Sequence, residues 1–294
     1  MDDINLYYKI ENPKNKKKGT LIFLHGFPEF HKQWKEQVIY FSNDYCCICP
    51  DLRGFNQSPK PQCIENYDIN LIADDVKNLI EKLCDEKTYL VGHDWGGIVA
   101  WILAGKYPSL IKKLIILNAP HPACYEREIQ TNSEQQKRAA YAVLFRQKIA
   151  HKLLARNNFS GLDQMFVNDL ITKGIFDEKD RDNYHKAWSK DSASDSMLNY
   201  YRATKLEFDQ NKNPIWQSFK LSDQLDSKSL KINVPTSIIW GEKDKALVKE
   251  NLNEIEKYID HFNIHYLPLN SHWLVHEDSQ KINEFIKNAI NNLG

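Results

Sequence analysis

The sequence predicts an α/β protein, with a mostly parallel central sheet flanked by helices and a helical cap inserted between two strands. Short apolar runs alternate with segments of helical period, and strands that alternate with helices pair in parallel through right-handed crossovers. From about Ala123 to Lys231 this alternation stops, and the chain becomes polar, aromatic-rich and helical in period. Strands return after this segment, so we interpret it as an insertion that covers the ends of the strands.

Each expected element follows from its own pattern of apolar residues. The strands are short apolar runs, and we expect them at residues 4–10, 20–24, 46–49, 89–91, 114–117, 236–240 and 263–267. The helices repeat apolar residues on one face, and we expect them at residues 69–83, 97–106 and 280–290. These elements divide the chain into a core of residues 1–122 and 231–294 and a cap of residues 123–230, inserted after the sixth strand.

Composition disfavours several classes of function. The 294 residues are 42% hydrophobic, and Lys and Arg number 39, as do Asp and Glu, so the chain lacks the basic surface of a nucleic-acid-binding protein. No apolar stretch is long enough to span a bilayer, and the N-terminal residues do not resemble a secretory signal. The six cysteines show no metal spacing, and we interpret them as mostly buried thiols of a cytoplasmic protein. The oligomeric state is open, and a homodimer is one hypothesis.

The most informative segment, residues 89–100, combines a buried strand, a tight glycine turn and an apolar helix. Asp94 stands at the tip of the turn. Gly92 and Gly96 stand where the backbone doubles back and leaves no room for a Cβ atom, which is the geometry of a nucleophile elbow. A carboxylate there displaces a leaving group from a saturated carbon and leaves an ester, whereas acyl transfer uses a serine. Asp94 is therefore the candidate nucleophile.

Three loops that follow strands complete a catalytic set. Phe27 follows the second expected strand, and we expect its backbone N–H to form an oxyanion hole with the backbone N–H of Trp95. Asp244 follows a later strand and is the candidate acid that orients a histidine, although aspartate is also a favoured helix N-cap. His272 is the candidate base, because histidine comes last in the order nucleophile, acid, histidine. The alternative for His272 is a surface histidine without a catalytic role.

Four motifs together resemble the soluble epoxide hydrolases of the α/β-hydrolase superfamily: HGFPE at 25–29, GHDWGG at 92–97, WGEKD at 240–244 and SHW at 271–273. The resemblance covers nearly the whole chain and implies the α/β-hydrolase fold. It also implies two cap tyrosines that donate hydrogen bonds to the epoxide oxygen, and Tyr141 and Tyr201 stand at the matching places. The alternative for Tyr141 is a core aromatic residue of a cap helix.

The resemblance implies a two-step hydrolysis through a covalent ester on Asp94, with a small neutral epoxide and water as substrates and a vicinal diol as product. Neither a metal nor a cofactor is expected, because the tyrosines act as the electrophilic groups. The candidate substrate contacts are His25, Pro28, Trp95 and Trp273.

Haloalkane and haloacetate dehalogenases are similar in fold and also use an aspartate, so they are the alternative. Trp95 and Ile98 stand where haloacetate dehalogenases carry arginines, and an anionic substrate would lack a partner there. Trp95 fits the halide site of haloalkane dehalogenases, but Phe27 stands where one subgroup has an asparagine, and Trp188 is the remaining candidate for a second halide ligand. A third hypothesis is a ligand-binding relative that has lost turnover.

Overall fold

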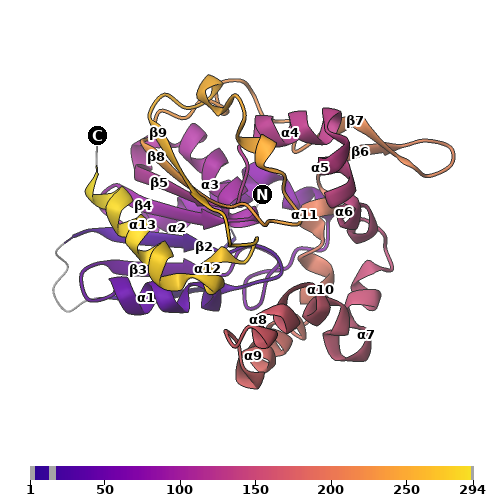
Figure 1. The fold of residues 1–294 in the computed structure, drawn as a ribbon, viewed down its shortest axis with the longest axis horizontal. Coiled ribbons are helices and arrows are strands. Elements are labelled where there is room, and N and C mark those ends of the chain that lie inside the picture. Colours follow the sequence, from indigo (N-terminus) through magenta and orange to yellow (C-terminus); the bar gives the residue numbers. More distant parts are fainter. Residues whose placement is uncertain (1–3, 13–17, 293–294) are drawn as a thin grey trace.

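The central sheet of the computed structural model, which describes residues 4–12 and 18–292, has seven strands in the order β1-β3-β2-β4-β5-β8-β9 (Figure 1). The strands are β1 (Tyr8–Glu11), β2 (Thr20–Leu24), β3 (Cys46–Pro50), β4 (Thr88–His93), β5 (Ile111–Leu117), β8 (Thr236–Gly241) and β9 (Phe262–Leu267). All neighbouring pairs are parallel except β1 with β3. The predicted mostly parallel sheet is confirmed.

The inner strands of this sheet are buried on both faces, which explains why they appear in the sequence as continuous apolar runs. Every residue of β3, β4 and β8 is buried. The predicted strand at 20–24 coincides with β2, and the other core strands extend their predicted ranges by one to three residues. The exposed edge strand begins four residues later than predicted, at Tyr8.

Helices cover both faces of the sheet. On one face lie α2 (Ile69–Leu83) and α3 (Trp95–Lys106), which pack against each other, and on the other lie α1 (Lys35–Phe41) and α13 (Ser279–Asn291) (Figure 1). The Asp68 side chain caps the first turn of α2, where it accepts a hydrogen bond from the N–H of Asn70. A short helix, α12 (Leu274–Glu277), precedes α13. The predicted helices at 69–83, 97–106 and 280–290 are confirmed.

The insertion consists of short helices and one hairpin. The helices are α4 (Pro122–Thr131), α5 (Ser133–Arg138), α6 (Ala140–Phe145), α7 (Ala150–Leu162), α8 (Asn168–Thr172), α9 (Glu178–Trp188), α10 (Ala193–Ser196) and α11 (Asn199–Arg202). In Figure 1 the helices from α6 to α11 lie at one end of the sheet. The expected helical character of the insertion is thus confirmed for most of its length.

The prediction that the insertion contains no strand is wrong. Antiparallel strands β6 (Lys205–Phe208) and β7 (Pro214–Lys220) form a hairpin that projects from the cap in Figure 1. The sequence contains a signal for the turn of this hairpin, because aspartate is typical of tight turns. In the structure, Asp209 accepts hydrogen bonds from the backbone of Asn211 and Asn213. The aromatic residues of β7, Trp216 and Phe219, thus belong to a strand and not to the helical pattern expected for the insertion.

The place of the insertion also needs correction. Five strands, not six, precede it among residues 4–12 and 18–292. The division into a core of residues 1–122 and 231–294 and a cap of residues 123–230 remains a proposal, with α4 at its boundary in contact with both α3 and β7.

Two further observations bear on the environment of the protein. None of the helices in the described part of the chain is long and apolar enough to cross a membrane. Burial raises the pKa of the Cys47 thiol to about 12 and that of the Cys124 thiol to about 11. Both cysteines are therefore protonated and unreactive at neutral pH. Residues 1–3, from which the absence of a secretory signal was partly inferred, lie outside the described residues.

Candidate active site

Asp94 lies at a sharp strand-to-helix turn between β4 and α3. Its φ of 51° and ψ of −125° are strained for a residue with a side chain, as expected at a nucleophile elbow. A Cβ atom at Gly92 would lie 2.6 Å from the carbonyl oxygen of Gly96, and one at Gly96 would lie 2.3 Å from that of Leu24. Both glycines are therefore required for the close approach of the backbone segments, as the sequence predicts.

The carboxylate of Asp94 faces the loop that follows β2. Its Oδ1 atom accepts a 2.7 Å hydrogen bond from the backbone N–H of Phe27. This N–H is therefore directed at the place where negative charge would develop on an Asp94 ester under attack by water. Trp95 is the first residue of α3, and its N–H has no acceptor within the helix. The assignment of both groups to an oxyanion hole stays a prediction.

His272 lies between the carboxylates of Asp94 and Asp244. Its Nδ1 atom is 2.6 Å from Oδ2 of Asp244, and its Nε2 atom is 3.4 Å from Oδ2 of Asp94. The histidine is buried with 8% exposure, so the alternative of a surface histidine is wrong. The structure thus places the predicted nucleophile, base and acid together from three separate loops.

Asp244 is not the N-cap of a helix, which was the alternative for this residue. Its Oδ1 accepts hydrogen bonds from the backbone N–H groups of Ala246 and Leu247, while Oδ2 faces His272. The next helical turn begins only at Lys249. All contacts to the carboxylate therefore hold it in the orientation that faces His272.

Asn118 supports Asp244, and the sequence analysis did not identify it. It follows β5 directly, and its side-chain amide donates to Oδ2 of Asp244 at 2.6 Å and accepts from the N–H of Gly241 at 2.6 Å. The signal that led to Asp244, a polar residue directly after a buried strand, applies equally to Asn118.

A second supporting residue, His93, holds the backbone of the candidate base. Its Nε2–H donates to the carbonyl oxygen of His272 at 2.8 Å, and its Nδ1 accepts from the Gln33 side chain at 2.7 Å. Burial lowers the pKa of His93 to about 4, so the ring is neutral at pH 7. These two partners require the tautomer that carries its proton on Nε2.

The two candidate tyrosines contact each other, and the charge of Asp94 acts on both. Tyr141 on α6 and Tyr201 on α11 contact each other edge to face, with 5.9 Å between ring centroids. The ring of Tyr201 also contacts those of Phe27 and Trp95, at 5.4 Å and 5.3 Å. Burial, neighbouring tyrosines and the negative charge of Asp94 raise the pKa of both phenols well above the usual value. Both hydroxyl groups therefore remain protonated and able to donate.

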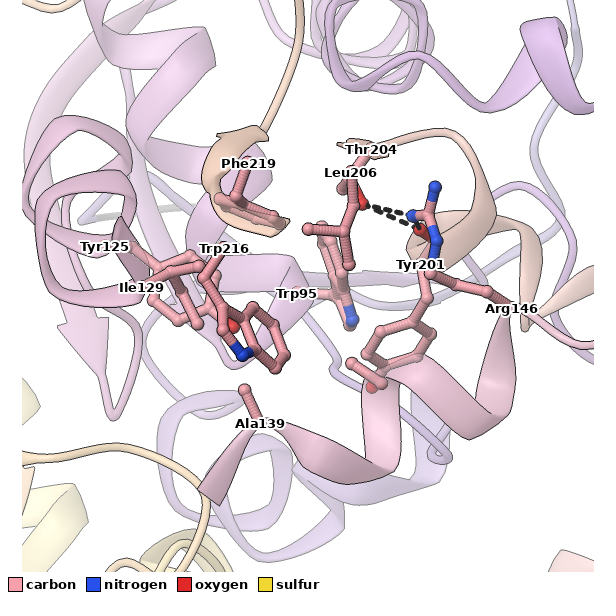
Figure 2. A pocket seen from close by; sticks show the side chains of 11 residues that line it. Trp95, Tyr125, Ile129, Ala139, Arg146, Tyr201, Thr204, Leu206, Trp216 and Phe219 are labelled. Carbon is pink, nitrogen blue, oxygen red and sulfur yellow. Dashed lines mark hydrogen bonds between the residues drawn. The ribbon is translucent and has the colours of Figure 1, made fainter. Parts of the chain in front are cut away.

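A small cavity of about 30 Å³ adjoins Trp95 and Tyr201. Figure 2 shows that side chains from the core, from α4, from the cap helices and from the hairpin surround it. Trp216 and Phe219 of β7 form part of its wall, as does Tyr125 of α4. A cavity of this size holds only one or two water molecules, so a larger substituent requires side-chain movement.

The structure shows the contacts of one predicted substrate-binding residue, His25, in detail. Its ring is fully buried, and both ring nitrogens bond to the backbone, Nδ1 to Gly26 and Nε2 to Leu52. Its contact with substrate stays a prediction. Its role is to hold the loop that carries Phe27. The roles of Pro28 and Trp273 in substrate binding stay predictions.

The charges of the site favour an ionised nucleophile. Burial alone would raise the pKa of Asp94, but the hydrogen bond and charge of His272 hold it below the usual value. Burial alone would lower the pKa of His272, but the charges and hydrogen bonds of Asp244 and Asp94 raise it well above the usual value. In the resting protein at neutral pH, Asp94 is therefore an anion beside a protonated His272.

This charge balance predicts a pH-dependent ester population. Esterification removes the Asp94 charge that raises the pKa of His272, so His272 becomes a neutral base more readily in the ester. As the pH falls, His272 stays protonated while unreacted Asp94 remains an anion, so attack on substrate continues and ester hydrolysis slows. We expect the ester fraction to rise from pH 8 to pH 5, measured by acid quench and intact-protein mass spectrometry. An equal fraction at both pH values would show that His272 does not limit the second step.

Among the described residues, no group of three or more His, Cys, Asp or Glu side chains is arranged to bind a metal ion.

The parallel sheet, the elbow and the three-residue set that follows β4, β8 and β9 define an α/β hydrolase. The model of the alpha/beta hydrolase fold family matches residues 19–278, and the chain belongs to this family. The protein is thus a hydrolase of that fold.

Individual relatives agree with this family. The AB hydrolase superfamily protein YfhM of Bacillus subtilis is 32% identical over 92% of this chain and 90% of its own length. Epoxide hydrolase 1 of Caenorhabditis elegans is 32% identical over 93% of this chain and 65% of its own length. A crystal structure of a variant of the Bacillus megaterium epoxide hydrolase, with a naphthyloxy-propane-diol product, has a TM-score of 0.87 at 34% identity, with 98% of each chain covered. The predicted resemblance to epoxide hydrolases is therefore confirmed.

Proposed function

We propose that the protein converts a small neutral epoxide to a vicinal diol through a covalent ester on Asp94. The observation that carries this proposal is an aspartate at the elbow, within electrostatic range of two protonated tyrosines, the buried Tyr201 and the partly buried Tyr141. A carboxylate can attack a saturated carbon. Phenol hydroxyl groups can donate hydrogen bonds to the epoxide oxygen, which stays bonded to the second ring carbon when the ring opens.

In the first step, an oxygen of Asp94 attacks one epoxide carbon. The bond between that carbon and the ring oxygen breaks, and the oxygen takes the electron pair. Tyr141 and Tyr201 donate hydrogen bonds to this alkoxide as it forms, and it takes up a proton from solvent to become a hydroxyl group. The product of this step is a hydroxyalkyl ester of Asp94.

In the second step, His272 removes a proton from water, and the hydroxide attacks the carbonyl carbon of the ester. Asp244 orients the imidazole and stabilises its positive charge. The N–H groups of Phe27 and Trp95 donate to the oxyanion of the tetrahedral intermediate. When this intermediate collapses, the diol leaves with the proton from His272. The Asp94 carboxyl group then releases its own proton to solvent, which restores the carboxylate and balances the proton taken up in the first step. The scheme needs no metal or cofactor.

Similarity supports the same product class. The Bacillus megaterium enzyme variant is complexed with a 1,2-diol as its product, and a vicinal diol is the product proposed for this chain. The proposal includes a cytoplasmic location, which the buried, protonated thiols support. A homodimer also remains a proposal.

The dehalogenase alternative receives less support from the geometry. The indole N–H of Trp188 donates to the carbonyl oxygen of Pro28 at 2.6 Å, so it is engaged and does not point a free donor at a halide. Trp95 and Ile98, which stand where haloacetate dehalogenases have arginines, provide no positive charge. A relative without turnover is also disfavoured, because each catalytic role has a candidate residue.

The test is a parallel screen of a styrene-type epoxide, a haloalkane and fluoroacetate, with diol and halide quantified separately. We expect diol formation without added metal and equal rates in the presence of a chelator. Halide release well above the rate of diol formation would replace the proposal with the dehalogenase alternative. No product from any substrate would favour a relative without turnover.

A further inference from the structure

The loop that supplies the Phe27 N–H contacts the cap at each of four consecutive residues. The ring of Phe27 packs against aromatic rings of α6 and α11, with 5.2 Å and 5.4 Å between ring centroids. The carbonyl oxygen of Pro28 and the carboxylate of Glu29 both accept hydrogen bonds from the cap helix α9. The ring of Phe30 packs edge to face against a ring of the same helix, at 5.2 Å. The position of this loop therefore depends on the cap as well as on the core.

The core holds the beginning of the loop. The backbone N–H of Gly26 donates to the Gln33 side chain at 3.1 Å, and its carbonyl oxygen accepts from the ring of His25 at 2.9 Å. The same carbonyl oxygen accepts a 3.0 Å hydrogen bond from the N–H of Glu29, which closes a turn. We call residues 26–29 the Phe27 turn. Its first residue is bonded to the core, and its last two residues are bonded to α9.

Two buried side chains of α9 donate the hydrogen bonds to this turn. The indole N–H of Trp188 donates to the carbonyl oxygen of Pro28 at 2.6 Å, and the hydroxyl of Tyr184 donates to Oε2 of Glu29 at 2.7 Å. Both aromatic side chains are only 3% exposed, so water does not compete for these bonds. Burial alone would raise the pKa of Glu29, but the charge and hydrogen bond of His276 hold it below the usual value. The bond from Tyr184 is therefore charge-assisted.

The two proposed steps differ in how strongly they depend on the position of the Phe27 turn. The Phe27 N–H donates to Oδ1 of Asp94 at 2.7 Å. Donors stabilise an oxyanion over a narrow range, about 2.7 to 3.1 Å, so a small displacement of the turn misdirects this N–H. The Asp94 anion can attack substrate without the donor, whereas the tetrahedral intermediate of ester hydrolysis carries its charge on the oxygen that faces it. Displacement of the turn therefore affects the second step more than the first.

We propose that Trp188 and Tyr184 are positioning residues, which hold the Phe27 N–H in the oxyanion hole through their hydrogen bonds to the Phe27 turn. These bonds couple the cap to the core, because the ester on Asp94 is hydrolysed rapidly only while α9 is bonded to the turn. The inference rests on the proposed function and gives the cap a role in the second step, besides the role of its tyrosines in the first.

Trp188→Phe and Tyr184→Phe each remove one donor to the turn and keep an aromatic ring on α9. We expect each of these α9 variants to slow ester hydrolysis about three- to thirtyfold and to change ester formation less than about twofold, because a misplaced donor loses part of what an absent donor loses. Single-turnover rapid quench followed by intact-protein mass spectrometry measures both rates. The matched control is Tyr200→Phe, because Tyr200 also donates from the cap to a core carbonyl oxygen, that of Arg53. Its ester hydrolysis should equal that of the wild type.

The Phe27 N–H can also be observed without turnover. The pair Gly-Phe occurs twice in the chain, at positions 26–27 and 54–55. Protein labelled with ¹³C at the glycine carbonyl carbons and with ¹⁵N in phenylalanine therefore gives two correlation signals in NMR, those of Phe27 and Phe55. Phe27 is expected to give the downfield signal, because its N–H donates to a carboxylate. The α9 variants are expected to move the Phe27 signal, and the control variant is expected to leave it in place.

The combined result separates this inference from the proposed function. Slower ester hydrolysis together with a displaced Phe27 signal would support the positioning role. Ester hydrolysis at the wild-type rate, equal slowing of both steps or an unmoved Phe27 signal would overturn that role and leave the proposed function standing. A displaced signal in a protein that forms no ester from any epoxide would overturn the proposed function and retain the role of α9 in holding the turn. The two α9 variants are independent tests, so loss of the fold in one leaves the other decisive.

Discussion

Asp94→Asn is expected to abolish ester formation and to lower epoxide turnover by about ten-thousandfold or more, as loss of a nucleophile does in other hydrolytic enzymes. An amide is a poor nucleophile toward saturated carbon, and the other groups of the site cannot replace it. In His272→Gln, hydrolysis of the Asp94 ester is expected to fail instead. Attack by Asp94 still occurs, but no base activates water, so the ester accumulates.

Intact-protein mass spectrometry distinguishes the two variants. After addition of epoxide, His272→Gln is expected to gain the mass of one substrate molecule, and Asp94→Asn is expected to show no prompt adduct. His261→Gln is the control, because His261 is an exposed histidine outside the site. In labelled water, a single turnover of wild type is expected to place the label in the Asp94 carboxylate. Label found only in the diol would mean direct attack by water, and the covalent mechanism would be wrong.

Tyr201→Phe and Tyr141→Phe are each expected to slow ester formation by about ten- to a thousandfold, the range for removal of one donor to a developing oxyanion. The fold should persist, because phenylalanine retains the aromatic contacts of both rings. Ester formation is measured by rapid quench in the His272→Gln background, where the second step does not interfere.

Tyr200 provides the matched control for this pair. It is adjacent to Tyr201 and fully buried, but its hydroxyl donates to the carbonyl oxygen of Arg53 at 2.9 Å. Tyr200→Phe should therefore lower the free energy of unfolding by about 1 kcal/mol and retain ester formation. If Tyr201→Phe behaved like Tyr200→Phe, Tyr201 would be a structural residue, and the same outcome for Tyr141→Phe would make Tyr141 a core aromatic.

The sequence by itself determined the parallel sheet, the elbow and the order of the catalytic set. Each of these features depends on local physical chemistry, and the residues of a single segment show it. Strands buried on both faces require continuous apolar runs, as in β3 and β8. The turn at Asp94 requires glycines at positions 92 and 96, where a Cβ atom would collide with backbone.

Only the tertiary structure decided which polar residues support this set. His25 and His93 are both histidines at the ends of buried strands, yet His25 bonds to the loop of Phe27 and His93 to the backbone of His272. Asn118 meets Asp244 across 126 positions of the chain. Such contacts depend on how loops distant in sequence converge in space, and no pattern within a single segment contains that information.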